Sequence, residues 1–273
     1  IEYLEHLHPY TLKKATKKNN ISILAGAIKC GEIRLIDHVF LMKRKPVIAI
    51  DGPAGAGKST VTKLIAKKLN LLYLDTGAMY RALSWFLIKE KIDFRKKDQL
   101  QKVLKNISIV FKSNSNSIQD IFINNFCVTK EIRSQKISSI VSKISAIKEI
   151  REFLVKEQQK IGELGGLVAE GRDIGTTVFP DAELKIFLTA SINERAKRRK
   201  SDLESQDSNA IELNQLKELI KKRDFEDSNR EISPLRKADD AIELFTDGCS
   251  INEVADKIID FFNEKIPKEI QLE

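Results

Sequence analysis

The segment 46–70, PVIAIDGPAGAGKSTVTKLIAKKLN, restricts the fold of this chain more than any other stretch. Val47–Ile50 is a short, fully apolar run, which predicts a buried parallel strand. The spacing Gly52-x-x-x-x-Gly57-Lys58-Ser59 that follows is the complete P-loop pattern. A helix comes next, with its expected apolar face at Val61, Leu64, Ile65 and Leu69. Strand, loop and helix occur in the order that a phosphate site requires, which favours this interpretation over a glycine-rich turn before an ordinary helix.

The loop has the chemistry to hold a nucleoside triphosphate. Glycines let successive backbone N–H groups converge on one anion, and the helix N-terminus adds partial positive charge. Lys58 can reach the β- and γ-phosphates, and the Ser59 hydroxyl can coordinate the accompanying Mg²⁺. We therefore expect Mg·ATP at Gly52, Pro53, Ala54, Gly55, Ala56, Gly57, Lys58, Ser59 and Thr60.

Composition narrows the class of protein. The chain has 273 residues, 42% of them hydrophobic, and its formal net charge of +8 favours an anionic partner, either nucleotide phosphates or nucleic acid. No apolar run approaches the roughly 20 residues of a membrane span, and there is no signal-peptide pattern at the start. Cys30, Cys127 and Cys249 form no C-x-x-C pair, which favours a reducing, cytoplasmic location without disulfides or structural zinc.

Short apolar strands alternate with helices after the loop. The expected strands are 71–75, 167–169, 184–190 and 242–246, and the expected helices are 76–90, 95–105, much of 131–163, and segments that begin with capping boxes at Ser191 and Ser250. The last helix should be buried through Ile251, Val254, Ile258, Phe261 and Phe262. Between 107 and 129 the pattern is β-like with an Asn124-Asn125 hairpin turn, which indicates an inserted unit. The fold class expected is a doubly wound, mostly parallel α/β domain.

Residues 1–41 differ from the rest of the chain. Residues 1–8 are strand-like, 21–41 could form strands or a helix with a turn at Gly31, and the segment has too few apolar residues for its own core. The phrase AGAIKCGEIRLIDHVFL resembles the C-terminal end of pantoate–β-alanine ligases, with His38 in place of Asn. This resemblance, and a start at Ile1 instead of Met, imply part of a longer bifunctional protein whose ligase activity is absent here. An interface or tether is the alternative, and 42–45 is expected to be a solvated basic linker.

Arginines are frequent near the predicted strand ends. Arg81, Arg172, Arg223 and Arg230 lie beyond strand ends or on the helix after a polar connection at 201–210, and Arg195, Arg198 and Arg199 lie beside that connection. A single Arg is usually a surface charge, but several in a P-loop protein can clamp two opposed phosphate groups. Phosphoryl transfer requires positioning and charge neutralisation more than covalent chemistry. We therefore expect a kinase that acts on a phosphorylated small molecule.

Five phrases resemble bacterial cytidylate kinases over about 46–263. They are GPAGAGKST, YLDTGAMYR, IFINNFCVTKEIR, AEGRDIGTTVFPDAELKIFLTAS and KKRDFEDSNR, in that family's order. The resemblance implies a P-loop nucleoside monophosphate kinase fold over 46–266. It also implies an inserted acceptor-binding unit at about 106–150 and a lid at about 195–225.

The resemblance implies roles for individual residues. The catalytic set is Lys58, Arg172 and Arg230. The acceptor phosphate would be bound by Arg81, Arg172 and Arg230, and the cytosine ring by Ser142, Arg151 and Asp173. The sugar would contact Arg223 and Asp227, and the acceptor pocket would be lined by Thr76 and Tyr80. On the lid side, ATP would lie near Arg195, Arg198 and Arg199. Asp173 can accept from the cytosine 4-amino group, and such a site would reject uracil because its polar groups would remain unpaired.

The chain departs from the family pattern in three places. Thr76 replaces a common Ser, and Phe225, Glu226 and Ser228 lower the positive charge near the lid. Glu170 stands where Asp is also common, with either an indirect role at Mg²⁺ or a structural one.

The expected activity is Mg·ATP-dependent phosphorylation of CMP or dCMP by a monomeric kinase domain, without a nucleic-acid or membrane partner. The full-length protein would oligomerise, if at all, through its ligase domain. A kinase for UMP or dephospho-coenzyme A is one alternative. A basic nucleic-acid-binding ATPase is another, although the single Trp and four Tyr are not interleaved with the lysines as stacking would require.

Overall fold

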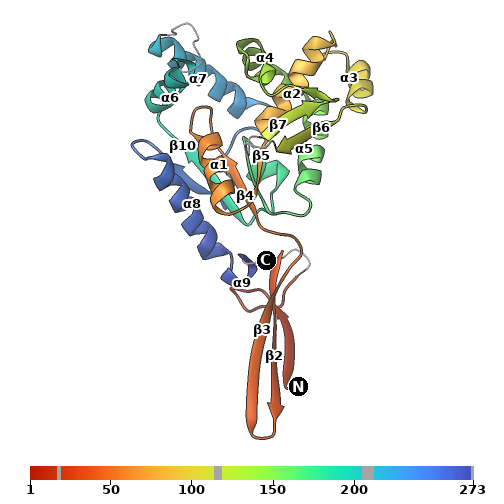
Figure 1. Ribbon diagram of the computed structural model, residues 1–273, viewed down its shortest axis with the longest axis vertical. Helices are drawn as coiled ribbons and strands as arrows, with labels where there is room; N and C mark the ends of the chain where they lie inside the picture. The colour runs from red at the N-terminus through yellow and green to blue at the C-terminus, as the bar shows by residue number, and fades with distance from the viewer. Residues whose placement is uncertain (17–19, 114–118, 205–211, 272–273) are drawn as a thin grey trace.

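The computed structural model describes residues 1–16, 20–113, 119–204 and 212–271. Three sheets form in these ranges. Figure 1 shows the largest sheet inside a body of helices, with a long antiparallel sheet from the N-terminus projecting below it. The predicted α/β architecture is confirmed, and the projecting sheet is an addition to it.

The central sheet has five strands. They are β4 (Val47–Asp51), β5 (Leu72–Asp75), β9 (Leu167–Gly171), β10 (Leu184–Thr189) and β11 (Ile242–Phe245). Their order is β11-β10-β4-β9-β5, and every neighbouring pair is parallel. All five residues of β4 are buried, as expected for an apolar strand in the middle of a parallel sheet.

Helices cover both faces of this sheet. Side chains alternate along β4, so Ile48 and Ile50 pack with α1 (Lys58–Lys68) and α8 (Ile251–Lys265). Val47 and Ala49 pack with α2 (Thr76–Lys89) and α5 (Lys148–Ile161) on the other face. No helix in the described ranges is long and apolar enough to cross a bilayer.

The apolar faces predicted for α1 and α8 are only partly confirmed. Leu64, Leu69 and Phe261 are only half-buried. Ile251 is exposed because it lies in the first turn of α8, beyond the edge of the core, whereas Val254, Ile258 and Phe262 are buried as predicted. The capping box that begins α8 at Ser250 is confirmed.

The inserted unit lies above the carboxyl edge of the central sheet (Figure 1). It contains α3 (Lys97–Leu104), the antiparallel strands β6 (Ile109–Ser113), β7 (Gln119–Ile123) and β8 (Phe126–Cys127), a 3₁₀ turn at Glu131–Arg133, and α4 (Gln135–Ser145). The predicted hairpin is confirmed, with positive φ angles of 45° and 69° at Asn124 and Asn125. Residues 114–118, which fall within the β-like stretch 107–129, lie outside the described residues.

Two packed helices occupy the predicted lid region. They are α6 (Ile192–Glu204) and α7 (Leu213–Asn229), and residues 205–211 between them lie outside the described residues. Only half of the expected capping box at Ser191 forms. Its hydroxyl accepts from the Glu194 N–H, but its own N–H donates to Asp247, and the Glu194 carboxylate accepts from Arg198 instead.

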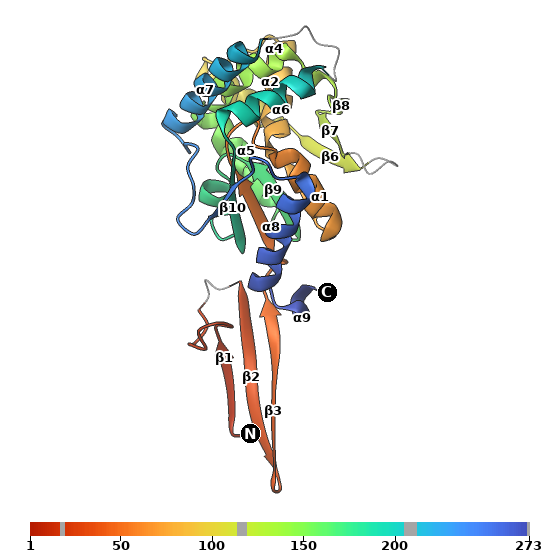
Figure 2. The same cartoon turned by 90° about the vertical axis from the view of Figure 1, so that its left-hand side faces the viewer.

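In its described residues, 1–16 and 20–42, the N-terminal segment forms strands and no helix. β1 (Tyr3–Leu7), β2 (Ile21–Cys30) and β3 (Ile33–Met42) pair antiparallel in the order β1-β2-β3, and Gly31 makes the expected turn with φ 62°. Figure 2 shows the sheet from the side, extending away from the body. The short α9 (Lys268–Gln271) lies against β3 at the near end.

Specific contacts join this sheet to the body. Glu183, just before β10, accepts from the Val47 N–H (2.7 Å) and from the Asn20 amide (2.9 Å). Arg44 pairs with Asp181 at 3.0 Å, and its side chain is only 13% exposed. The expectation of a solvated linker at 42–45 is therefore wrong for Arg44, because acidic residues of the body surround its guanidinium.

Candidate functional site

The carboxyl ends of four parallel strands meet at one edge of the central sheet. β4 ends at Asp51, β5 at Asp75, β9 at Gly171 and β10 at Thr189. Ligands of open α/β sheets bind at this edge. The P-loop leaves β4 here and leads directly into α1.

The loop conformation requires glycine. Gly52 has φ 150°, and a Cβ on it would lie 2.0 Å from the Leu188 carbonyl oxygen. Gly57 has φ 88° and caps α1, so the first helical N–H groups face the loop. The Lys58 ammonium folds onto the loop and donates to the carbonyl oxygens of Gly52 (2.8 Å) and Pro53 (2.7 Å). Burial lowers its pKa, and Arg172 lowers it further.

A hydrogen-bonded group lies behind Ser59. The Ser59 hydroxyl donates to Glu170 Oε2 at 2.8 Å, and the Tyr73 hydroxyl donates to Glu170 Oε1 at 2.5 Å. Thr76 donates to the Glu170 carbonyl oxygen at 2.7 Å. Burial and the neighbouring Asp75 raise the pKa of Glu170 against these bonds. One hydroxyl and one carboxylate thus stand at the start of α1, where hard-cation chemistry is possible.

Basic side chains from three segments surround the loop. Burial lowers the pKa of Arg223 to about 10, with Arg172 and Arg81 adding to the effect. The pKa of Arg81 is also lowered, first by burial and then by Arg172 and Arg133. The Nε atom of Arg223 is buried without a hydrogen-bond partner. Cations that destabilise one another and keep an unused donor form a site suited to a phosphate group.

Asp227 connects two of the segments that carry this basic cluster. Arg172 Nε donates to Asp227 Oδ2 at 2.9 Å, which connects the end of β9 to α7. Burial alone would raise the pKa of Asp227, but Arg172 and Arg223 lower it overall. Charge attraction thus joins Arg172, expected at the acceptor phosphate, to Asp227, expected at the sugar together with Arg223.

The residues expected to bind the cytosine ring lie deeper in the protein than the basic cluster. Arg151 donates to Asp173, and their side chains are 2% and 6% exposed. Arg230 approaches the other oxygen of Asp173 at 3.6 Å, and Tyr80 lies with its ring 5.4 Å from the Arg151 guanidinium. The Tyr80 hydroxyl, Arg151 Nε and Arg230 Nη2 are buried without hydrogen-bond partners. Ser142, on α4, is half-buried. Unpaired buried donors of this kind are costly unless a ligand uses them.

The three lid arginines differ from one another. Arg195 is buried and donates to the carbonyl oxygens of Ala190 and Ala54 and to Asp224 (2.7 Å). Arg198 donates to Thr246 and, at 3.4 Å, to the Ala56 carbonyl oxygen. Only Arg199 is exposed. Arg195 and Arg198 thus support the P-loop from outside, which the sequence did not indicate.

Asp51 is a site residue that the sequence analysis missed. It is buried at the end of β4 and accepts from the N–H groups of Ile174 and Gly175, both at 2.8 Å. These donors belong to the π turn Ile174–Val178 that follows Arg172 and Asp173. An acid at a strand end directly before the glycine loop was the available signal. Asp51 therefore fixes the acceptor-side turn to the strand that carries the P-loop.

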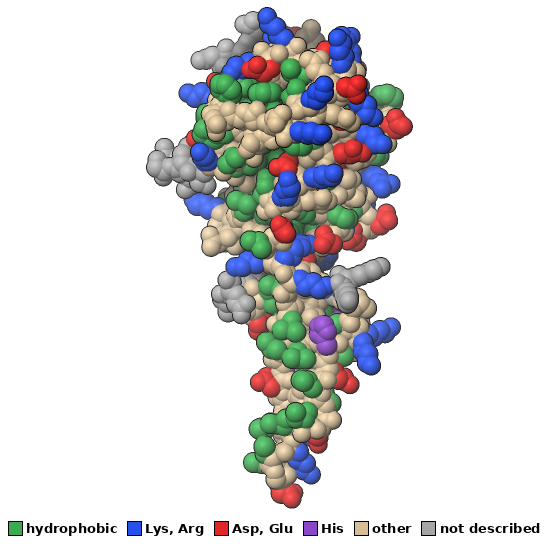
Figure 3. All heavy atoms as spheres, turned by 90° about the vertical axis from the view of Figure 1, so that its right-hand side faces the viewer, with side chains coloured by type: hydrophobic (Ala, Val, Ile, Leu, Met, Phe, Trp, Pro, Cys, Tyr) green, Lys and Arg blue, Asp and Glu red, His purple; other side chains and the backbone are tan. Residues whose placement is uncertain are grey.

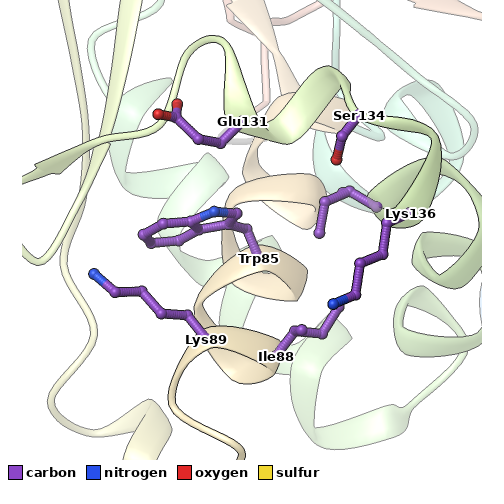
Figure 4. Close-up of a pocket in the computed structure, with 7 residues that line it drawn as sticks. Trp85, Ile88, Lys89, Glu131, Ser134 and Lys136 are labelled. Atoms are coloured by element: carbon purple, nitrogen blue, oxygen red, sulfur yellow. The ribbon is translucent and has the colours of Figure 1, made fainter.

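A separate pocket lies on the outer side of α2 (Figure 4). It is lined by Trp85, Ile88, Lys89, Glu131, Ser134, Lys136 and Ile137. Lys89 lies over the Trp85 ring at 4.7 Å from its centroid. None of the expected nucleotide-binding residues lines this pocket, so it is distinct from the candidate site.

Comparison with known proteins matches the sequence of this chain to one family. The family model described as cytidylate kinase matches residues 48–264. The bifunctional pantoate ligase/cytidylate kinase of Prochlorococcus marinus strain MIT 9312 is 80% identical over 272 residues, covering 100% of this chain and 53% of that protein. The protein of the same name from strain NATL1A is 56% identical over 270 residues, covering 99% of this chain and 52% of its own length.

This chain therefore spans about half the length of the curated relatives it matches. Among solved structures, shikimate kinase from Acinetobacter baumannii in complex with shikimate covers 82% of this chain and 96% of its own at 16% identity. Its TM-score of 0.39 is too low to support a conclusion.

Proposed function

Since this chain belongs to the cytidylate kinase family, we propose that it transfers the γ-phosphoryl group of ATP to CMP or dCMP, giving ADP and CDP or dCDP. The observation that carries the proposal is the basic cluster at the P-loop, inside the family match: Lys58, Arg81, Arg172 and Arg223. Two anionic substrates brought together would neutralise this cluster.

The donor would lie on the loop from Gly52 to Thr60. Its phosphates would meet the N–H groups at the start of α1, and Lys58 would exchange its two carbonyl partners for phosphate oxygens. Ser59, with Glu170 behind it, is the position that could hold Mg²⁺. Mg²⁺ would supply neutralisation of phosphate charge when bound.

The acceptor would lie across the carboxyl edge from the loop. Arg81, Arg172 and Arg230 would hold its phosphate, and Arg223 and Asp227 its sugar. Asp173 would accept from the cytosine 4-amino group while Arg151 and Ser142 donate to the ring. The buried, unpartnered donors of Tyr80 and Arg230 support a polar ligand here.

Transfer would then depend on position and charge. An oxygen of the acceptor phosphate would attack the γ-phosphorus in line, with Lys58, Arg172 and Arg230 stabilising the charge on the transferred group. Closure of the α6–α7 pair over the loop would exclude water and limit ATP hydrolysis, with Arg199 as the exposed arginine on that side.

The whole protein would be bifunctional. Relatives named bifunctional pantoate ligase/cytidylate kinase support a pantoate ligase activity in the part beyond this chain. We propose a cytoplasmic location, which suits the free cysteines Cys30, Cys127 and Cys249, and a kinase domain that acts as a monomer.

The test is ADP release with Mg·ATP and one acceptor at a time: CMP, dCMP, UMP, AMP or dephospho-coenzyme A. We expect rapid turnover with CMP and dCMP and little with the others. Preference for UMP or dephospho-coenzyme A would replace the acceptor assignment. No turnover with any acceptor, together with ATP hydrolysis stimulated by single-stranded nucleic acid, would overturn the kinase proposal.

A further inference from the structure

The pocket on the outer side of α2 has the size and the lining of a small-molecule site. We call it the outer pocket and define it by Trp85, Ile88, Lys89, Glu131, Ser134, Lys136 and Ile137. Its volume is about 360 Å³. Ligand sites range from roughly 300 to 1,000 Å³, so this pocket is large enough for a ligand with one ring system. The Trp85 ring and two isoleucines form the apolar part of the lining.

The charged groups of the outer pocket are available to a ligand. The Lys89 ammonium lies over two aromatic rings, 4.7 Å from the centroid of Trp85 and 3.3 Å from that of Phe126, and these rings hold it in place. Within the described ranges, Lys89, Lys136 and Glu131 form no ion pair. Figure 3 shows many Lys and Arg side chains on the side of the body that carries the inserted unit. The charges on this side therefore favour an anionic ligand.

The helix α4 begins at the outer pocket with open N-terminal groups. Ser134 is the N-cap residue, its hydroxyl makes no hydrogen bond to the helix, and the first turn contains no acidic residue. Figure 4 shows Ser134 and Lys136 on one side of the Trp85 ring, with Lys89 and Glu131 on the other. An anionic group would thus lie on the Ser134 side, while the other side offers polar partners to the edge of a ring.

The turn Glu131–Arg133 connects the outer pocket with the acceptor side. Residues on either side of Arg133 line the pocket, namely Glu131 and Ser134. Ile132 is buried in the core that also contains α2 residues, which fixes the turn to the body. Burial lowers the pKa of Arg81, and Arg133 is among the cations that lower it further, so the two guanidinium groups lie close together. A negative charge beside Ser134 would attract Arg133 and weaken its support of the acceptor phosphate.

We propose that the outer pocket binds a small anion that carries a planar ring, and that the bound anion weakens acceptor binding through Arg133. The ring packs against Trp85, and the anionic group accepts hydrogen bonds from Ser134 and Lys136. Nucleoside monophosphates and aromatic carboxylates share this chemistry. The effect on the acceptor rests on the proposed function, in which Arg81 holds the acceptor phosphate.

Binding is measured in the full-length protein with CMP and Mg·ADP at saturation, so that the nucleotide site is filled. The probes are phenylacetate for the aromatic carboxylates and GMP for the nucleoside monophosphates. Trp85 is the single Trp of this chain, so its fluorescence reports on the outer pocket. We expect at least one probe to change the fluorescence and to give a binding isotherm in calorimetry, and the tighter probe identifies the source of the ligand. If neither probe binds up to millimolar concentration, the proposal is overturned.

Three variants assign the binding to the outer pocket. Trp85→Phe should remove the fluorescence change and keep the calorimetric binding, because Phe keeps an apolar ring. Lys136→Gln should raise the Kd about 10-fold, since a charge-assisted contact is lost. Lys143→Gln, at an exposed lysine of α4 outside the pocket, should leave the Kd unchanged. A fluorescence change that persists in Trp85→Phe, or equal Kd values in the two lysine variants, would overturn the site.

Kinetics test the effect on the acceptor. The bound probe should raise the KM for CMP about 5-fold and leave the KM for ATP unchanged. Lys136→Gln at the same probe concentration should remove most of this rise. A rise that persists in Lys136→Gln would indicate competition at the acceptor site and overturn the effect through Arg133, as would binding with an unchanged KM. Absence of CMP phosphorylation without any probe would contradict the proposed function alone, because the fluorescence and calorimetry do not depend on activity.

Discussion

The proposed donor side and the proposed acceptor side of the candidate site are built differently. The donor side consists of consecutive residues, 52–60, whose backbone conformation depends on Gly52, Gly55 and Gly57. The acceptor side takes its side chains from α2, α4, α5, the end of β9 and α7, and joins them through ion pairs such as Arg151–Asp173 and Arg172–Asp227. A change on the donor side should therefore affect Mg·nucleotide binding and catalysis with little effect on stability, whereas a change on the acceptor side should affect acceptor binding and stability together.

Lys58→Met tests the donor side and should have the largest effect. We expect kcat to fall about 10³-fold, because a cation next to the transferred group is lost. The unfolding temperature should change little, because the loss of the hydrogen bonds to the Gly52 and Pro53 carbonyl oxygens is offset by removal of a desolvated, buried ammonium. ADP release and thermal unfolding are measured with Lys67→Met, an exposed lysine of the same helix, as control. A kcat within 10-fold of the original would contradict the role of Lys58.

Asp173→Ala tests the acceptor side. It leaves Arg151 and Arg230 without their carboxylate, so we expect a loss of about 3 kcal/mol in the free energy of unfolding. The KM for CMP should rise about 100-fold, and discrimination against UMP should weaken. Urea unfolding and acceptor kinetics at saturating ATP measure both, with Asp260→Ala, a change at an exposed position of α8, as control. Unchanged selectivity between CMP and UMP would reject the assigned contact.

Asp51→Asn tests the connection between the two sides. The substitution places an amide N–H₂ opposite one of the two N–H donors of Ile174 and Gly175, which should cost about 1–3 kcal/mol in stability. We expect kcat/KM for CMP to fall about 10-fold while the KM for ATP stays nearly constant. Equal effects on both substrates would show that Asp51 has only a structural role.

The pH dependence gives a further readout for Asp51. Burial raises its pKa to about 6 from an ordinary value of 3.8, with Asp173 adding and Lys58 opposing. The carboxyl therefore takes up a proton as the pH falls from 7 to 5, so kcat/KM for CMP should fall in that window and Asp51→Asn should abolish the fall. The free energy of unfolding changes with pH in the opposite direction. Because the folded-state pKa is the higher one, the contribution of Asp51 is fully present below about pH 4 and is lost as the pH rises through 6.

Tyr73→Phe should have the smallest effect and acts on the donor side. The loss of one hydrogen bond to Glu170, about 1 kcal/mol, should raise the Mg²⁺ concentration for half-maximal activity about 5-fold and weaken Mg·ADP binding in calorimetry to the same extent. Tyr80→Phe is the matched control, because its hydroxyl lies on the acceptor side and should change only the KM for CMP. The same Mg²⁺ requirement in both variants would remove Tyr73 and Glu170 from the donor side.

The sequence by itself determined the elements whose interactions are local. The P-loop, the buried strand and the Ser250 cap depend on neighbouring residues and hydrophobic period. All three formed, and the strand predicted at Val47–Ile50 is one residue longer, Val47–Asp51. The acceptor residues were expected from family resemblance. The structure added that their charged groups form the pairs Arg151–Asp173 and Arg172–Asp227.

Only the tertiary structure decided the remaining features. Residues 21–42 are strands because they pair with each other and with β1, which their own pattern left open. Asp51 reaches Ile174 and Gly175, and Arg195 reaches Ala54 and Asp224, across intervals of 29 to 141 residues. Hydrogen bonds between segments so far apart depend on the packing of strands and helices, and a local sequence pattern has no information on which segments that packing brings into contact.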